Sequence, residues 1–469
     1  MTKNIYDVAV IGNGSIGCSV AFNLITNQKK LKIALIGPEN FKGSASLAAG
    51  AMLNIFGEIE HDSLNSKYGK AKLELLLKAK KMWPNFLQQI NKYAKVEEKV
   101  NLKKGTIILN NSSADHLDDL NFNSIVDCLK DYKEKYEILD SNNSKKIIGY
   151  EPSERNRSLK SVYIPNEDFI DNPLKLLRNY YKIFNREKNI DIFKSYALKI
   201  NKFKKLNLIK VSKDNILAKN IVICCGAYSQ NFINQLNLKG IPKLFFGSGN
   251  AIVASYEKKI KQSQVIRTPN RGMACGLHTV PYGNNHLYIG ATNRISDKPF
   301  EYPIISGVMV LMKSLTKEIN ENYSNLKIKK ILVGHRPTTA DTFPLIGPIN
   351  NHEGMYIATG TKRDGLTLSP LIGKIITDLI VQKNQKILPK FFYPERKIIK
   401  TMTKEEGIKK SVMHALSAAY QHDLNFPDNN LKDQIIHNLH NEIRSIYKKK
   451  NINFGVPPEI LNMYKYDKI

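Results

Sequence analysis

Near the N-terminus stands the stretch Tyr6-Asp-Val-Ala-Val-Ile-Gly-Asn-Gly-Ser-Ile-Gly17, which decides the fold of this part of the chain. Residues 6–11 form a short apolar run rich in β-branched side chains, and such a run predicts a buried strand. Residues 19–25 have helical spacing, and a second apolar run covers residues 31–36. Strand, helix and strand within about 30 residues have the length of a βαβ unit.

Three glycines in the turn of this unit indicate a dinucleotide site. Gly12 permits the tight turn, Gly14 lets the backbone approach a pyrophosphate, and Gly17 lets helix and strand pack closely. The N-terminus of the following helix then faces the anion. The alternative is an ordinary glycine-rich turn. The acidic ribose ligand usual in such sites would fall near Gly37, so Glu39 is either that ligand or a solvated loop carboxylate.

The remaining patterns predict a mixed α/β chain. Strand-like runs cover residues 105–109, 206–213 and 219–225, and residues 68–94 have helical spacing. Residues 244–292 alternate short apolar runs with Gly and Asn turns, as in an antiparallel sheet. Residues 355–380 return to strand, glycine-rich loop and helix. After residue 400, apolar side chains recur at helical spacing, at Ile435, Ile436, Leu439, Ile443 and Ile446.

Composition narrows the function classes. The 469 residues suffice for two or three domains, and no apolar run reaches the roughly 18 residues of a membrane span. Five scattered cysteines without a CxxC pair disfavour a disulfide scaffold and a zinc site, and they fit a reducing cytoplasm. Asp433, His437 and His440 have metal-ligand spacing, but a polar helix face explains them more simply, so we expect no metal.

The net charge of +29 raises the question of a nucleic-acid partner. Basic residues are spread along the chain, with no block of five or more like charges. We therefore favour compositional drift over a nucleic-acid surface, without excluding the latter.

Five ordered stretches resemble the D-amino-acid oxidase family of FAD-dependent oxidoreductases, and most of all its glycine oxidase-like branch. All five lie after the glycine turn, and they occur in the same order as the corresponding segments of the family. They are Ser44-Ala-Ser-Leu-Ala-Ala-Gly-Ala-Met-Leu53, Ile221-Val-Ile-Cys-Cys-Gly-Ala-Tyr-Ser229, Val280-Pro-Tyr-Gly-Asn-Asn-His-Leu-Tyr-Ile-Gly-Ala-Thr292, Gly334-His-Arg-Pro-Thr-Thr-Ala-Asp-Thr-Phe-Pro-Leu-Ile-Gly347 and Ala358-Thr-Gly-Thr-Lys-Arg-Asp-Gly-Leu-Thr-Leu-Ser-Pro370.

The resemblance implies an architecture. We expect a Rossmann-like FAD-binding domain of discontinuous segments over residues 1–95, 152–240 and 330–390. An inserted antiparallel-sheet substrate domain would comprise residues 96–151 and 241–329. A helical C-terminal extension would occupy residues 396–469 and could mediate self-association or bind a partner protein.

The resemblance also implies which residues bind FAD and substrate. Arg336 matches the arginine that pairs with the substrate carboxylate, and Arg363 matches a second active-site arginine. The expected cofactor residues are Gly12, Gly14, Gly17, Glu39, Ser44, Ser46, Gly50, Met52, Gly226, Ala227, Gly360, Lys362, Arg363, Asp364, Gly365, Leu366 and Thr367.

Three positions depart from the family pattern. His278 stands where the family has a carboxylate-binding tyrosine. We expect it either to donate to a carboxylate or titrate near neutral pH, or to be only a half-exposed strand residue. Tyr282 replaces an arginine, and Thr361 replaces a histidine, so a substrate other than plain glycine is expected. No cysteine lies in residues 331–345, where members with covalent flavin carry theirs, which predicts non-covalent FAD.

The implied activity is oxidation of a carboxylate-bearing amine or amino acid by hydride transfer to flavin. Water would hydrolyse the imine, and O2 would accept the electrons to give H2O2. Three alternatives remain open at this point. They are a dehydrogenase that passes electrons to a quinone or a protein, a tRNA-modifying oxidoreductase, and a catalytically inactive binding protein.

Overall fold

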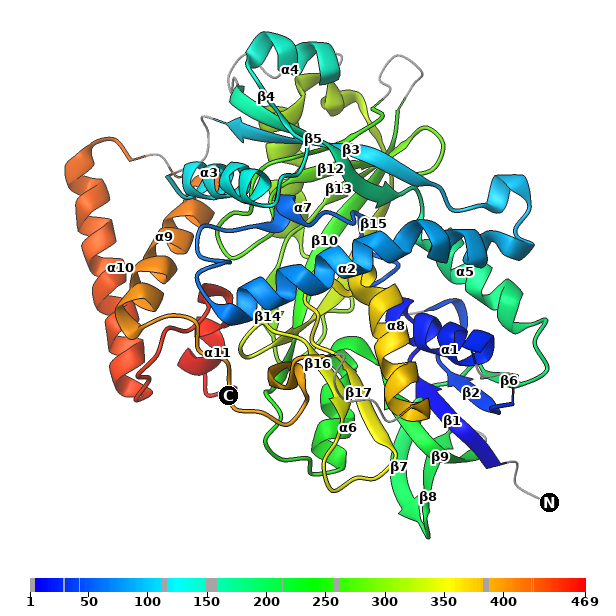
Figure 1. Cartoon of the computed structure of the whole chain (residues 1–469). Coiled ribbons are helices and arrows are strands. Elements are labelled where there is room, and N and C mark those ends of the chain that lie inside the picture. Colours follow the sequence, from blue (N-terminus) through cyan, green and yellow to red (C-terminus); the bar gives the residue numbers. More distant parts are fainter. Residues whose placement is uncertain are drawn as a thin grey trace.

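The computed structural model describes residues 5–27, 30–41, 43–111, 116–148, 158–212, 214–256, 262–382, 388–422, 424 and 426–469. Its described part contains two sheets and a helical C-terminal region (Figure 1). All five cysteines are unpaired, as the sequence predicts. Within the described residues we find no helix that is both long and apolar enough to cross a membrane.

The first sheet has the order β16-β17-β9-β1-β2-β6 among the described residues, with β7 and β8 continuing from β9. Pairs β17–β9, β9–β1, β1–β2 and β2–β6 are parallel, which confirms the predicted βαβ start. Its strands are β1 (Ile5–Ile11), β2 (Ile33–Ile36), β6 (Ile190–Phe193), β7 (Ala197–Phe203), β8 (Leu206–Val211), β9 (Asn215–Ile223), β16 (Leu345–Pro348) and β17 (Met355–Thr359).

Helices cover this sheet because both faces of its central strands are apolar. Val8 and Val10 of β1 face one core, and Ala9 and Ile11 face the other. The helices of the first core are α1 (Ser15–Asn27), α2 (Lys67–Ile90), α5 (Pro173–Phe184) and α8 (Gly365–Val381), while α6 (Ser229–Gln235) packs on the opposite core.

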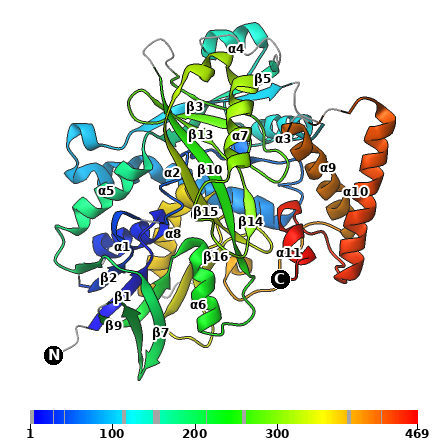
Figure 2. The same cartoon turned by 180° about the vertical axis from the view of Figure 1, so that it is seen from behind.

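The second sheet is antiparallel except for the parallel pair β11–β3. Its described strands follow the order β14-β10-β13-β12-β11-β3-β5-β4, and β15 pairs with β10 over nearly its whole length (Figure 2). They are β3 (Leu102–Asn111), β4 (Glu137–Leu139), β5 (Ser158–Ile170), β10 (Leu244–Ser255), β11 (Val265–Arg267), β12 (His278–Pro281), β13 (His286–Gly290), β14 (Arg294–Ser296) and β15 (Lys327–Thr339). The helices near them are α3 (His116–Asp131), α4 (Ser141–Ile148) and α7 (Ile305–Ser314).

Two strands within the ranges that we predict for the FAD-binding domain belong to the second sheet. In residues 152–240, β5 pairs with β3, and in residues 330–390, the C-terminal part of β15 pairs with β10. A strand pattern reveals that a segment is extended but not which strand lies beside it, and this explains the difference. The boundary at residue 152 lies outside the described residues, and the remaining limits stay predictions.

The C-terminal extension is helical, as predicted. Its helices are α9 (Lys404–Gln421), α10 (Asn429–Lys449) and α11 (Leu461–Lys465). Ile443 and Ile446 of the predicted apolar face are buried beside Tyr447, and the same cluster includes Phe245 of β10. Figure 1 shows these helices side by side at one flank of the molecule, in orange and red. The extension therefore packs on the end of the second sheet.

Gly17 makes the closest backbone contact in the first βα unit, and a substitution there tests the fold. A Cβ on Gly17 would lie 1.8 Å from the carbonyl oxygen of Gly12. We expect Gly17→Ala to lower the free energy of unfolding by about 3 kcal/mol, because backbone must move to admit the methyl group. Urea unfolding of the cofactor-free protein, followed by circular dichroism, measures this.

Gly14→Ala is the matched control. A Cβ at Gly14 meets only the hydroxyl oxygens of Ser44 and Ser46, at 3.4 Å. The control should keep its free energy of unfolding to within about 1 kcal/mol. Equal stability losses in the two variants would contradict the packing role of Gly17.

Candidate active site

A cavity of about 650 Å³ is lined by residues from both sheets. Its volume lies in the range of ~300–1,000 Å³ that is usual for small-molecule and cofactor sites. The turn after β1, residues 43–52, the N-terminus of α8, and parts of β12, β13 and β15 all contribute to its wall. Segments far apart in the sequence therefore meet at one site.

At one end of the cavity lies the glycine turn. Gly12 has φ of +114°, and a Cβ there would lie 2.4 Å from the carbonyl oxygen of Cys224, so only glycine fits. Gly14 lines the cavity together with Ser15 and Ile16 of the first turn of α1. No acidic side chain stands in this turn, so the positive end of the helix is open to an anion.

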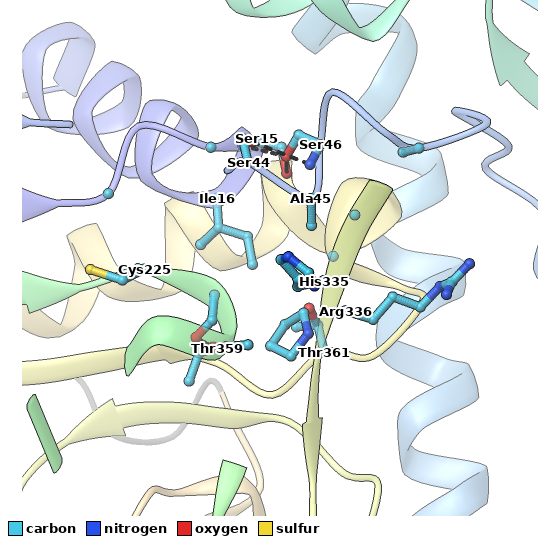
Figure 3. A pocket seen from close by; sticks show the side chains of 18 of the residues that line it. Ser15, Ile16, Ser44, Ala45, Ser46, Cys225, His335, Arg336, Thr359 and Thr361 are labelled. Atoms are coloured by element: carbon cyan, nitrogen blue, oxygen red, sulfur yellow. Dashed lines mark hydrogen bonds between the residues drawn. The ribbon is translucent and has the colours of Figure 1, made fainter. Parts of the chain in front are cut away.

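Residues 44–46 are tied to the same helix end. The Ser15 amide donates to Ser46 Oγ at 3.0 Å, and Ser46 Oγ donates to Ser15 Oγ at 3.1 Å. Ser44 Oγ accepts from the Ser46 amide at 3.2 Å. Figure 3 shows the three serines together above the cavity. Their hydroxyls and the helix end together form a polar cradle.

Most of the predicted cofactor residues line this cavity. They are Gly12, Gly14, Ser44, Ser46, Gly50, Met52, Gly226, Ala227, Lys362, Arg363, Asp364, Gly365, Leu366 and Thr367. The structure places three others outside its lining. Gly17 packs against Gly12, and a Cβ on Gly360 would lie 2.8 Å from Thr339 Cγ2, so both glycines serve close packing. Glu39 forms an exposed ion pair with Lys194 at 3.0 Å.

The placement of Glu39 favours its reading as a solvated loop carboxylate. Gly37 and Pro38 line the cavity in its place, together with residues 195–198. A side chain at position 37 would overlap Asn13, since a Cβ there lies 2.2 Å from Asn13 Cγ. The expected acidic position is therefore closed by packing.

The N-terminus of α8 points at the other part of the cavity. Gly365, Leu366 and Thr367 form its first turn, and Asp364 occupies the N-cap position. Lys72 of α2 pairs with Asp364 at 2.6 Å, and Trp83 Nε1 donates to the Thr367 carbonyl at 3.0 Å. This second helix end adds a positive potential that stabilises negative charge in the cavity.

Arg336 lies on β15 and extends from it along the cavity (Figure 3). Its Nη1 donates to the Thr292 carbonyl at 3.0 Å. A Cβ on Gly249 would lie 2.5 Å from Nη1, so the missing side chain makes room for the guanidinium. Among the described residues, no carboxylate lies within ion-pairing distance of Arg336.

Arg363, by contrast, already has two carboxylate partners. Its guanidinium pairs with Glu58 at 3.2 Å and with Glu60 at 3.1 Å. The fully buried Arg267 also holds Glu58, at 2.6 Å. Burial raises the pKa of Glu58, but Arg267 and Arg363 outweigh burial and lower it to about 2. Glu58 is thus a carboxylate at any ordinary pH, and it offsets part of the positive charge of Arg267 and Arg363.

His278 is neither half-exposed nor a group whose pKa lies near neutral pH, contrary to two of our expectations. The ring is buried, lines the cavity and stacks on Tyr288 with a centroid distance of 5.7 Å. Burial, and next the charge of Arg267, lower its pKa to about 3. Its Nδ1 lies 2.8 Å from the Gly276 carbonyl and so carries the proton. Nε2 is then an acceptor in a neutral ring.

Sequence reasoning missed the carboxylates Glu58 and Glu60, as well as Arg267 and Gly249. Glu58 and Glu60 follow the small-residue stretch 44–53, but charged residues in a loop usually indicate solvent exposure. Their partner Arg363 lies about three hundred positions further on. Only the tertiary structure brings these charges together.

The neutral state of His278 predicts a pH-dependent contribution to stability. The unfolded imidazole takes up a proton near pH 6.5, whereas the folded ring does so only near pH 3. The contribution is therefore complete above pH 6.5 and falls as the pH drops toward 3. Between pH 7 and pH 5, wild type should lose at least about 1 kcal/mol more unfolding free energy than His278→Gln.

The matched control for this pH experiment is His286→Gln. His286 lies on the neighbouring strand β13, and its Nδ1 also contacts a carbonyl two residues earlier, at 2.6 Å, but in an exposed place. Urea unfolding at both pH values should give the control the wild-type dependence. An unchanged pH dependence in His278→Gln would contradict the neutral buried ring.

Comparisons with known proteins agree with this geometry. The glycine oxidase of Bacillus subtilis is 23% identical over 382 residues, which are 81% of this chain and 94% of the relative. The glycine oxidase of Bacillus licheniformis is 24% identical over 381 residues, covering 80% and 93%.

Among solved structures, glycine oxidase from Geobacillus kaustophilus aligns with a TM-score of 0.71 and 19% identity. This alignment covers 84% of the present chain and 100% of the other. Iminodiacetate oxidase from Chelativorans sp. BNC1 aligns with a TM-score of 0.67 and 18% identity, covering 84% and 100%. At these identities the likeness shows a shared fold. The family model described as "DAO: FAD dependent oxidoreductase" matches residues 7–379, and the chain therefore belongs to this family of FAD-dependent oxidoreductases.

Proposed function

We propose that this chain oxidises the C–N bond of a small amino acid or other carboxylate-bearing amine. The observation that carries the proposal is which of the three cations lining the cavity have a carboxylate partner. Lys362 and Arg363 are paired with carboxylates, whereas Arg336 donates only to the Thr292 carbonyl among the described residues. The guanidinium fork of Arg336 suits a substrate carboxylate.

The residues of the cavity fit FAD. Because Gly12 and Gly14 carry no side chains, a ligand can approach the backbone closely at the first turn of α1. The open N-terminus of this helix suits a pyrophosphate. Ser44 and Ser46 would hold the adjoining part of the cofactor. Residues 362–367, at the N-terminus of α8, would stabilise negative charge on the ring. We propose non-covalent binding because no cysteine lies in residues 331–345.

Bound FAD supplies a two-electron acceptor for the amine, whose oxidation gives an imine that water hydrolyses. Arg336 fixes the carboxylate and thereby orients the substrate. The neutral ring of His278 offers Nε2 as an acceptor for an N–H of the substrate amine. Glu58 stays ionised and keeps Arg363 paired, so Arg336 determines where the carboxylate binds. Positioning by these groups supplies much of the rate enhancement.

We propose O2 as the electron acceptor and H2O2 as its product. The glycine oxidases named above support this choice by their similarity. Oxygen uptake with no added acceptor tests it. Turnover that requires a quinone or dye would instead identify a dehydrogenase.

The direct test is a screen of amino acids and amines against the purified, flavin-containing protein without oxygen. We expect at least one small carboxylate-bearing amine to bleach the flavin absorbance, with ammonia or an amine released after oxidation. A protein that takes up no FAD, or holds FAD that no amine bleaches, would overturn the proposal.

Arg336→Lys should weaken substrate binding while FAD stays bound. A lysine keeps the charge but loses the two parallel hydrogen bonds to a carboxylate. We expect kcat/KM to fall about 100-fold, mainly through KM, by steady-state kinetics. The exposed Arg294, which packs on Phe300, supplies the control Arg294→Lys. A loss confined to kcat, or an equal loss in the control, would count against carboxylate binding by Arg336.

Gly14→Ala should weaken FAD binding without unfolding the protein. The added methyl group would stand in the cradle, near the hydroxyls of Ser44 and Ser46. We expect the dissociation constant for FAD to rise at least about tenfold, as measured by fluorescence titration of the cofactor-free protein. Wild-type affinity in this variant would place the pyrophosphate elsewhere.

A further inference from the structure

Side chains of the C-terminal extension reach the wall of the active site. Lys410 of α9 pairs with Asp62 at 2.7 Å and with Glu60 at 3.4 Å. Glu459, in the short helical turn Pro458–Ile460, pairs with Lys362. The family model ends at residue 379, so both Lys410 and Glu459 lie outside the matched family region.

These contacts are largely shielded from solvent. The side chains of Lys362 and Glu459 are 14% and 10% exposed, and that of Lys410 is 12% exposed. Burial raises the pKa of Glu459, but the ammonium of Lys362 outweighs burial and lowers it to about 2. Removing one member of such a pair leaves an uncompensated charge in a poorly solvated place.

Lys362 and Arg336 face the same space. Both side chains line the main cavity. Both also line a second, much smaller cavity of about 10 Å³, whose wall includes His414 and Glu459 of the extension. This smaller cavity is about the size of one water molecule. The extension therefore closes the region beside Arg336, and Glu459 holds the lysine that shares this region.

We propose that the C-terminal extension sets the charge that the active site accepts. Glu459 retains the ammonium of Lys362, so that Arg336 is the one cavity cation without a carboxylate partner among the described residues. The cavity then selects substrates with one carboxylate over those with two. This inference rests on the proposed function, because it takes Arg336 as the carboxylate site. Glu459 is in these terms a positioning residue, which acts through Lys362.

The test is equilibrium binding of acetate and malonate to the FAD-containing protein, followed by the change in flavin absorbance. These ions carry one and two carboxylates. Glu459→Gln removes the charge that holds Lys362 and leaves the shape nearly unchanged. We expect malonate affinity to rise relative to acetate affinity by about tenfold, because the released ammonium can pair with the second carboxylate.

The double variant Lys362→Met/Glu459→Gln removes both charges and should restore the wild-type ratio of the two affinities to within about twofold. A merely structural role of Glu459 would not be reversed in this way. The control Glu405→Gln breaks an exposed pair of the same extension, with Arg444, and should change neither affinity.

Three results would overturn the inference. An unchanged malonate-to-acetate ratio in Glu459→Gln would show that Lys362 does not reach the ligand. If that variant fails to bind FAD, the double variant decides: a tenfold loss of acetate affinity there would make Lys362 itself the carboxylate site. If neither ion binds the wild-type protein, the site does not recognise carboxylates, and both the proposed function and this inference are wrong. If acetate binds but the predicted selectivity is absent, only this inference is wrong.

Discussion

No side chain fits between β1, the start of α1 and the end of β9, and the site depends on this close approach. A Cβ on Gly12 would collide with the Cys224 carbonyl, and one on Gly17 would collide with the Gly12 carbonyl. The chain therefore turns tightly, and the first turn of α1 lines the cavity. The hydrogen bonds between Ser15 and Ser46 then fix residues 44–46 against the same helix end. This packing leaves the N-terminus of α1 open to an anion.

The other half of the cavity is organised by charge. Glu58 and Glu60 lie between the cations Arg267, Arg363 and Lys410. Burying such groups is unfavourable unless each is paired, so the network holds its members in fixed places. In the described part of the chain, Arg336 is the exception among the cations that line the cavity, since a carbonyl rather than a carboxylate receives its hydrogen bond. We propose that this charge, which no described carboxylate pairs, gives the site its preference for carboxylates.

The sequence predicts the backbone-dominated half of this site well, because its signals are local. The glycine spacing, the flanking apolar runs and the loop before α8 all lie within short stretches, and most of the residues predicted from the glycine turn and this loop line one cavity. The charge-dominated half leaves no local signal. Lys410 and Glu60 are 350 positions apart, and either would be taken for a solvated charge. The neighbours of β5 and β15 could not be predicted either, because a strand pattern does not indicate which strand lies beside it. His278 was recognised as a candidate, but its neutral state comes from burial that only the fold reveals.

The most direct measurement is a crystal structure of the FAD-containing protein with acetate or another unreactive carboxylate bound. We predict the carboxylate within hydrogen-bonding distance of both terminal nitrogens of Arg336 or of one together with Nε, the pyrophosphate at Gly14 and the first turn of α1, and Lys362 still paired with Glu459. A carboxylate held by Lys362 or Arg363, or FAD bound away from the glycine turn, would contradict this account.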